Sequence, residues 1–267
     1  MKEKIGLIGV GNMGTAILEG LLEKKVVDAG QVMVFDKITE KAAEFSGKWK
    51  VRVALSNFDV AKNSDVTILA VKPQDLAVTA AEISVAALGK VVISILAGMP
   101  VSKIKQVLTG ARVVRSMPNL GAMAGEGMTA ITSEDAAALE VAEHIFSASG
   151  KVVKLEEKYF NLVTAISGSG PAYFFLLMEL LIEEGKKNGL KEADAQLLAV
   201  QTALGAAKYA EKALGKETPA ELRARVTSKG GTTEAALNIF NKHKIADIVS
   251  EAVTAAVNRG KELAGGK

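Results

Sequence analysis

Short apolar runs alternate with longer amphipathic segments in the first half of the chain. Runs rich in Val and Ile predict strands at Ile5–Ile8, Val32–Phe35, Val66–Val71, Val91–Ile95 and Arg112–Met117. Weaker runs predict further strands at Val51–Ala54, Met128–Thr132 and Val152–Leu155. Continuously apolar strands that alternate with helices are typical of a parallel sheet that helices cover on both faces. This half is therefore predicted to be an α/β domain.

Apolar residues follow a helical repeat in the second half of the chain, from about Tyr159 onward. The segment Ala172–Ile182 is apolar nearly all round, which is typical of a buried helix, for example one between two subunits. An Ala- and Leu-rich segment, Glu192–Leu214, and an apolar stripe from Ile245 to Ala256 predict two more helices. We expect an α/β domain over residues 1–157 and an all-helical domain over residues 158–267 that forms a homo-oligomer.

Composition excludes several classes of protein and of site. The net charge is only +3 over 267 residues and no long run of like charge is present, so the sequence shows no basic patch that would bind nucleic acid. Without cysteine there is no disulfide, zinc-thiolate site or cysteine nucleophile, and neither of the two histidines has metal-ligand spacing. The stretch Ala172–Ile182 is about half as long as the ~20 residues that cross a bilayer. The N-terminal residues lack the pattern of a secretory signal. We expect a soluble cytoplasmic protein that binds no metal, nucleic acid or membrane.

A glycine-rich motif follows the first predicted strand directly. Gly9-Val10-Gly11-Asn12-Met13-Gly14 fits the pattern G-x-G-x-x-G and opens a predicted helix. In such a motif the first glycine allows a tight turn, the second lets the backbone approach a pyrophosphate, and the third lets helix and strand pack closely. The free N–H groups of the helix N-terminus then favour the negative phosphates. Gly9, Gly11, Asn12, Met13 and Gly14 are therefore expected to bind a dinucleotide.

The end of the second predicted strand supports the same site. Asp36 lies there, about 20 residues after the last glycine of the motif, where an acidic residue holds a ribose hydroxyl in this kind of fold. A carboxylate at this position suits NAD(H), whereas the adjacent Lys37 is able to pair with the 2′-phosphate of NADP(H). The sequence leaves the choice between NAD(H) and NADP(H) open.

Two more strand ends carry polar residues. Ala70-Val71-Lys72-Pro73 and Arg115-Ser116-Met117-Pro118-Asn119 both lie where a predicted strand gives way to a turn. Ligands of open α/β sheets gather at the carboxyl ends of strands, so both segments are candidates for the same site. A solvated lysine at a helix start explains Lys72 equally well.

A second glycine-rich segment lies in the helical half. Ser228-Lys229-Gly230-Gly231-Thr232-Thr233-Glu234 precedes a helix-like segment at Ala235–Asn241. Backbone N–H groups at such a helix start form an anion site, and the hydroxyls either cap the helix or contact a ligand. Ser167-Gly168-Ser169-Gly170 is a comparable segment whose small residues allow close approach of a helix or a cofactor. One glycine-rich site thus suits a pyrophosphate and the other a small carboxylate.

No histidine or lysine accompanies these motifs as an evident proton donor. Reduction of a ketone normally needs an acid beside the developing alkoxide, whereas an imine nitrogen is protonated before the hydride arrives. A well-placed hydroxyl such as that of Thr233 is then sufficient, because placement alone supplies much of the acceleration. The absence of an acid is therefore compatible with imine reduction and does not by itself establish it.

The sequence resembles the pyrroline-5-carboxylate reductases over nearly its whole length. The matching segments are Gly9–Gly14, Ala70–Gln74, Arg115–Asn119, Gly125–Gly127, Ala165–Tyr173, Gln201–Ala207 and Val226–Thr233. The segments SGSGPAY and SxGGTT, in this order, are specific to that family. The resemblance implies an N-terminal Rossmann-like domain and a helical dimerisation domain. It also implies dimers that often build larger rings, and an active site between the two domains to which a partner subunit contributes.

Roles for single residues also follow from the resemblance. It implies that Thr233 hydrogen-bonds the ring nitrogen of the substrate and that Ser228, Gly230, Gly231 and Thr232 hold its carboxylate, largely through the backbone. It places Asn57 near the adenosine ribose. The chain departs from the family at Lys229, where proline is usual, and this leaves the affinity for substrate more open than the type of reaction.

Two alternatives remain beside reduction of 1-pyrroline-5-carboxylate to proline by NAD(P)H. A β-hydroxyacid dehydrogenase or broader imine reductase shares the dinucleotide site, but the dehydrogenases carry a catalytic lysine where Gly168–Glu179 has none. A sensor that binds a dinucleotide without turnover is the second alternative. Such a sensor would not need the second anion site at Ser228–Thr233.

Overall fold

The computed structural model describes residues 1–263 and residue 265, and the chain divides into two compact units. The first unit comprises Met1–Ser169 and Ala255–Lys267, and the second comprises Gly170–Thr254. This division differs from the expected boundary between residues 157 and 158. The physical reason is that residues just after 157 are held in the first unit, where Phe160 and Ala165 are fully buried.

An eight-stranded sheet forms the centre of the first unit. Its strands are β1 (Ile5–Ile8), β2 (Val32–Phe35), β3 (Arg52–Val53), β4 (Val66–Leu69), β5 (Val91–Ser94), β6 (Arg112–Met117), β7 (Gly127–Thr132) and β8 (Gly150–Lys154). Their order in the sheet is β3-β2-β1-β4-β5-β6-β7-β8. The first six strands have the order of a doubly wound dinucleotide-binding fold, with the reversal between β1 and β4.

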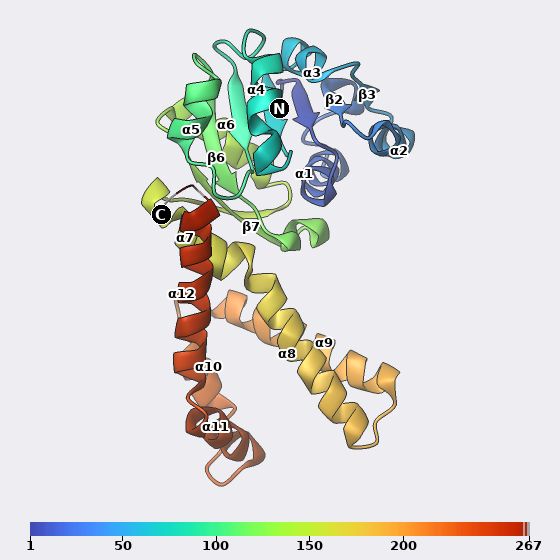
Figure 1. Ribbon diagram of the computed structural model, residues 1–267. Coiled ribbons are helices and arrows are strands. Elements are labelled where there is room, and N and C mark those ends of the chain that lie inside the picture. The colour runs from blue at the N-terminus through green and yellow to red at the C-terminus, as the bar shows by residue number, and fades with distance from the viewer. Residues whose placement is uncertain (264, 266–267) are drawn as a thin grey trace. The chain divides into compact units, whose positions relative to one another are not determined.

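Six helices cover the two faces of this sheet (Figure 1). On one face, buried residues of α1 (Asn12–Glu23), α2 (Thr39–Trp49) and α6 (Ala136–Phe146) pack on the strands. On the other face lie α3 (Asn57–Asn63), α4 (Leu76–Ile83) and α5 (Val101–Val107). In β1, Ile5 and Leu7 join the first cluster and Ile8 joins the second, because successive side chains of a strand point to opposite faces. The expected α/β architecture is confirmed.

The sheet is not wholly parallel, which corrects the expectation from sequence. Strand β7 runs antiparallel to β6, whereas β7 and β8 are parallel. Only the short η3 segment (Leu120–Ala124) connects β6 to β7, and a parallel connection needs a crossover of a dozen residues or more. Helix α6 supplies such a crossover between β7 and β8. Four strands also end earlier than expected: β3 at Val53, β4 at Leu69, β5 at Ser94 and β8 at Lys154.

Short helical segments connect the larger elements of the first unit. They are η1 (Ala29–Gln31), η2 (Pro73–Asp75), η4 (Glu157–Tyr159), α7 (Phe160–Val163) and η5 (Thr164–Gly168). The last of these is a π-helical turn in which the N–H of Ser169 donates to the carbonyl of Thr164 at 2.8 Å. Single π turns are rare and recur at functional sites. The turn ends the first unit within the SGSG segment.

The second unit is helical, as expected. It contains α8 (Gly170–Lys187), α9 (Glu192–Ala213), α10 (Pro219–Arg225), α11 (Thr232–Lys242) and the first part of α12 (Ile245–Leu263). Helices α8 and α9 lie side by side (Figure 1), and Gly185 permits their close approach because a Cβ there would lie 3.2 Å from the Ala195 Cβ.

Helix α8 exposes much of its apolar surface in the single chain. Tyr173, Phe174, Phe175, Leu176, Leu177, Leu180 and Leu181 are all exposed. Contiguous apolar surface of this kind marks a site of association. Among the described residues, the continuous helical run Glu157–Lys187 is also long and apolar enough to cross a membrane by length and composition alone. The expectation that its apolar stretch is too short is wrong, because α7 and η5 extend α8 at its N-terminus.

An ion pair with a buried arginine joins strand β6 to η4, just before α7. Arg115 in β6 is only 6% exposed, and its Nη1 lies 3.0 Å from Oε1 of Glu157. The guanidinium also lies over the Phe160 ring, 4.7 Å from the ring centroid. Burial lowers the pKa of Arg115, and the bond to Glu157 opposes that shift. The same Glu157 oxygen accepts the N–H of Val101 at 2.7 Å. Arg115 therefore serves packing here and is not free to bind a ligand.

We predict that Glu157→Ala destabilises the first unit by about 2–3 kcal/mol. The change leaves the buried guanidinium of Arg115 without its counter-charge and removes the acceptor of the Val101 N–H. The figure lies at the low end for a buried pair because the Glu157 side chain is 36% exposed. Urea unfolding followed by circular dichroism measures it. Glu156→Ala, which removes an exposed ion pair with Lys158, is the matched control and should change the midpoint little.

Candidate functional site

The glycine-rich loop lies where the strand order reverses, beside the end of β4. Gly9 follows β1 with φ +99° and its N–H donates to the Phe35 carbonyl at 2.8 Å. A Cβ at Gly9 would lie 2.6 Å from the Ala70 carbonyl oxygen. Both the backbone conformation and the close approach therefore require glycine. The loop Gly9–Gly11 and the segment after β4 both lie at the reversal of strand order, the place where ligands bind in folds of this kind.

Backbone donors at the start of α1 lack acceptors. Gly11 is the N-cap of α1, and the N–H groups of Asn12, Met13 and Gly14 make no hydrogen bond with any described residue. A Cβ at Gly11 would meet no heavy atom within 4 Å, so the space above the loop is open. At Gly14 a Cβ would lie 2.6 Å from the Gly9 carbonyl oxygen. An open second glycine and free N–H groups fit a pyrophosphate.

Asp36 holds the glycine-rich loop through the backbone. Its Oδ2 accepts the N–H of Val10 at 2.7 Å and its Oδ1 accepts the N–H of Ile38 at 2.8 Å. A carboxylate has about four acceptor positions, so each oxygen retains room for one ribose hydroxyl. Lys37 pairs with Asp75, with 3.0 Å between Nζ and Oδ2, and its side chain is 73% exposed. Because the Lys37 ammonium is exposed, it can leave Asp75 and pair with the 2′-phosphate of NADP(H). The geometry therefore accommodates either NAD(H) or NADP(H).

Asn57 carries a buried oxygen without a partner. Its Nδ2 donates to Oε2 of Glu82 at 2.7 Å, which orients the amide. Its Oδ1 is buried and has no hydrogen-bond partner among the described residues. A buried acceptor that is left unpaired is destabilising, and such groups call for an explanation such as a ligand. The orphan oxygen fits a hydroxyl or amine donor from the adenosine half of a dinucleotide.

The segment after β4 continues from the sheet into a partly exposed turn. The N–H of Ala70 donates to the Ile8 carbonyl at 2.8 Å, which continues the β1–β4 pairing up to the loop. Val71 is half-buried, whereas Lys72 and Pro73 are exposed. Pro73 is the first residue of η2, a position whose N–H makes no hydrogen bond within the helix, so proline is tolerated there. Ala70, Val71, Lys72 and Pro73 therefore lie at the same sheet edge as the glycine-rich loop.

The second candidate anion site lies at the start of α11, in the helical unit. Gly231 is the N-cap, and its N–H donates to the Ser228 carbonyl at 3.0 Å. A Cβ at Gly231 would lie 2.4 Å from Oγ of Ser228, so a side chain at this position would displace Ser228. Gly230 has φ +73°, a left-handed conformation that favours glycine. The two glycines thus fold the loop tightly against the helix end.

Several donors at this loop have no acceptor. The N–H groups of Thr232 and Thr233 make no hydrogen bond within the described part of the chain, nor do the hydroxyls of Ser228, Thr232 and Thr233. Ser228 and Thr232 are exposed and Thr233 is half-buried. A helix N-terminus with free amides and adjacent hydroxyls binds a small carboxylate well. The residues expected to bind substrate, Ser228 and Gly230 to Thr233, therefore form one contiguous group.

Two family models match the chain. Residues 157–263 match the model described as "Pyrroline-5-carboxylate reductase dimerisation", and residues 4–98 match the one described as "NADP oxidoreductase coenzyme F420-dependent". The pyrroline-5-carboxylate reductase of Pseudomonas aeruginosa is 40% identical over 98% of this chain and 97% of its own. That of Synechocystis is 38% identical over 98% and 99%.

Solved structures agree with these relatives. A pyrroline-5-carboxylate reductase of Coxiella burnetii superposes with a TM-score of 0.91, at 35% identity and over all of both chains. The Plasmodium falciparum enzyme, solved with NADP bound, has a TM-score of 0.87 at 27% identity over 98% of both chains.

This chain belongs to the pyrroline-5-carboxylate reductase family.

Asn119 ends the candidate segment Arg115–Asn119 and hydrogen-bonds to the π turn, a role that the sequence did not indicate. Asn119, just after β6, donates from Nδ2 to the carbonyl and the hydroxyl of Ser167 at 3.2 and 3.3 Å. Its Oδ1 accepts the N–H groups of Gly121 and Met128 at 3.2 and 3.0 Å. One amide thus ties β6, β7 and the SGSG segment together. The motif Arg115–Asn119 drew attention to this strand end, but no sequence pattern indicates which backbone groups the amide reaches.

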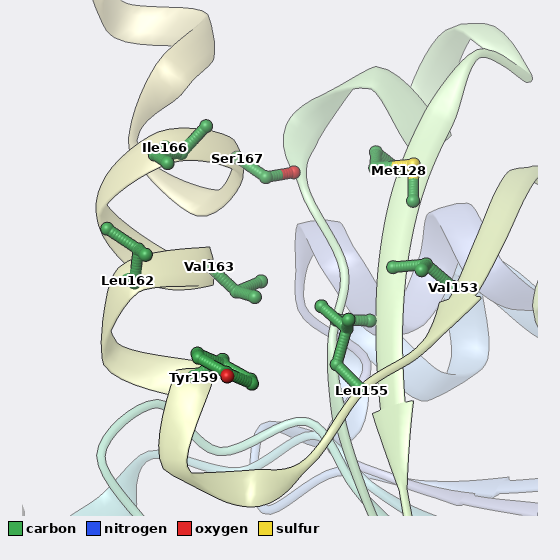
Figure 2. A pocket seen from close by; sticks show the side chains of 9 residues that line it. Met128, Val153, Leu155, Tyr159, Leu162, Val163, Ile166 and Ser167 are labelled. Carbon is green, nitrogen blue, oxygen red and sulfur yellow. The ribbon is translucent and has the colours of Figure 1, made fainter.

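An apolar pocket of about 380 Å³ lies beside the same turn. In Figure 2, Tyr159 and Val163 on the helical side face Val153 and Leu155 on the strand side. Met128, Ala130, Leu162, Ile166 and Ser167 complete the lining. None of the residues expected to bind cofactor or substrate lines it, and no charged side chain does. The helical side of the pocket falls within the residues that match the dimerisation model.

We predict that Gly11→Ala weakens binding of the dinucleotide while the fold is retained. The new methyl group points into open space in the free protein, yet it stands where a pyrophosphate approaches the backbone. Overpacking of this kind costs about 1–3 kcal/mol, or roughly 5- to 150-fold in Kd. Fluorescence titration with NADPH measures the change. Gly47→Ala is the matched control, because Gly47 lies in α2 and its Cβ position is also open.

Proposed function

We propose that the protein reduces 1-pyrroline-5-carboxylate to L-proline, the last step of proline biosynthesis, with NADPH or NADH as hydride donor. The observation that carries this proposal is the group of unpaired donors at the N-terminus of α11, next to the free hydroxyl of Thr233, in a chain of this family. A small ring that bears one carboxylate and one imine nitrogen matches that group. The open glycine-rich loop of the first unit provides for the dinucleotide.

The dinucleotide is held through the backbone of the first unit. Gly9, Gly11 and the N–H groups of Asn12, Met13 and Gly14 bind the pyrophosphate, and Asp36 and the orphan oxygen of Asn57 bind the adenosine half. Ala70, Val71, Lys72 and Pro73 line the path toward the nicotinamide. The bound reduced nicotinamide supplies the hydride.

The substrate is held by α11 and the loop that precedes it. The hydroxyl of Ser228 and the free N–H of Thr232 bind the carboxylate, Gly230 and Gly231 shape the loop around it, and Thr233 hydrogen-bonds the ring nitrogen. When the hydride reaches the imine carbon, the electron pair of the C=N bond moves to a nitrogen that is already protonated. No further acid is needed at that step. Thr233 is the catalytic residue in this proposal.

We infer that both domains act in a self-assembled, soluble enzyme of the cytoplasm. We propose a dinucleotide-binding domain over residues 1–157 and a helical dimerisation domain from residue 158. The match of residues 157–263 to the dimerisation model supports this boundary. A second copy would cover the apolar residues of α8, and dimers would associate further into a ring. Burial of α8 in a dimer accounts for its apolar length without a membrane. Light scattering of the purified protein measures the assembly.

The decisive assay follows loss of the absorbance of NADPH or NADH in the presence of 1-pyrroline-5-carboxylate. Oxidation that depends on the imino acid supports the proposal, and the ratio of the two rates reports which dinucleotide Asp36 and Lys37 favour. Cofactor binding without any oxidation would instead favour a sensor. Reduction of NADP+ or NAD+ by a 3-hydroxyacid, with no oxidation of NADPH or NADH by the imino acid, would favour a dehydrogenase.

We predict that Thr233→Val lowers kcat roughly 10- to 100-fold, the loss of one hydrogen bond to a charged group. Valine keeps the branched shape, so the start of α11 remains folded. Thr233→Ala should behave in the same way, and Thr233→Ser, which keeps the hydroxyl, should retain most of the activity. Steady-state kinetics with unchanged circular dichroism test these expectations. Wild-type turnover by Thr233→Val would remove this hydroxyl from the mechanism.

A further inference from the structure

A carboxylate of the chain itself occupies part of the proposed substrate site. Glu234 is the third residue of α11, and its Oε2 accepts the N–H of Gly230 at 2.7 Å. The side chain reaches back past the N-cap, Gly231, to the residue before it. This is the same loop whose N–H groups are proposed to bind the carboxylate of the substrate. Glu234 is half-buried and forms no ion pair with a described residue.

The contact differs from an ordinary helix cap. In a capping box, the acidic residue at the third helical position accepts the N–H of the N-cap. Here the N-cap N–H of Gly231 donates to the Ser228 carbonyl at 3.0 Å, so Glu234 takes the next donor along the loop instead. The N–H groups of Thr232 and Thr233 remain free at the same helix end. The carboxylate of Glu234 thus already lies at this helix terminus, and the free N–H groups there can bind a second carboxylate.

We propose that Glu234 is a resident competitor that weakens binding of the substrate carboxylate and so sets the affinity for the imino acid. This inference rests on the proposed function, because it assumes that the loop Ser228–Thr233 holds the substrate. Both carboxylates are stabilised by the same positive helix end, and two like charges at one such site disfavour each other. Substrate binding must displace the Glu234 oxygen from Gly230 or tolerate its charge. Glu234 acts on affinity and touches none of the reacting atoms.

Two substitutions separate competition from simple support of the loop. Glu234→Gln keeps an oxygen that can accept the Gly230 N–H but removes the charge, and Glu234→Ala removes both. Competition predicts that Glu234→Gln lowers the KM for 1-pyrroline-5-carboxylate about two- to fivefold, the range of one charge at a helix terminus, with a smaller effect on kcat. The gain should shrink in high salt because screening weakens the repulsion that the variant relieves. Glu44→Gln, which removes an exposed charge from α2, is the control and should leave KM unchanged.

A second measurement tests the inference without turnover. Isothermal titration with L-proline, a ring that carries the same carboxylate, should give a Kd that is about two- to fivefold tighter for Glu234→Gln than for the wild type. If Glu234→Gln binds L-proline more tightly but the wild type does not oxidise NADPH with the imino acid, the inference about Glu234 stands and the proposed function is overturned. Reduction by the wild type, together with KM and Kd values in Glu234→Gln that equal or exceed those of the wild type, would overturn the competitor alone. A rise in KM confined to Glu234→Ala would show that Glu234 only supports the loop, and would overturn the inference as well.

Discussion

Unpaired N–H groups at the first turn of a helix are the constraint on which both candidate sites depend. An α-helix leaves its first N–H groups without internal acceptors, and a glycine N-cap brings no side chain to satisfy them. Gly11 before α1 and Gly231 before α11 are both such N-caps. Backbone donors of this kind suit anions of different sizes, a pyrophosphate in one unit and a small carboxylate in the other. The remaining features of each site hold those donors in place.

The chain uses its own carboxylates on both glycine-rich loops. Asp36 accepts the N–H of Val10, and Glu234 accepts the N–H of Gly230. Asp36 thereby fixes the loop without taking the donors of Asn12 to Gly14, whereas Glu234 takes a donor from the proposed substrate loop itself. In the proposed function, the same interaction would support ligand binding in one unit and oppose it in the other. The difference lies in which N–H the carboxylate reaches.

Much of the fold could be predicted from residues that report on local structure. The runs at Ile5–Ile8, Val32–Phe35 and Arg112–Met117 are strands with the expected bounds, because short runs rich in Val and Ile are typical of the strands of a covered sheet. The antiparallel direction of β7 was not predicted, although the roughly ten residues between the expected strands Arg112–Met117 and Met128–Thr132 are too few for a parallel crossover. The π turn at Thr164–Gly168 also escaped prediction, because it depends on Asn119, far away in the sequence.

The sequence by itself determined the glycine-rich loops, the helix starts that follow them and the membership in this reductase family. These properties depend on residue type and on spacing along the chain, both of which are local. Only the tertiary structure decided that Arg115 is buried against Glu157, that Asn57 keeps an orphan oxygen and that Glu234 occupies the Gly230 N–H. Each of these follows from which groups folding brings within hydrogen-bond distance. The reach of a side chain toward a particular backbone group is set by packing and not by the residue's own preference.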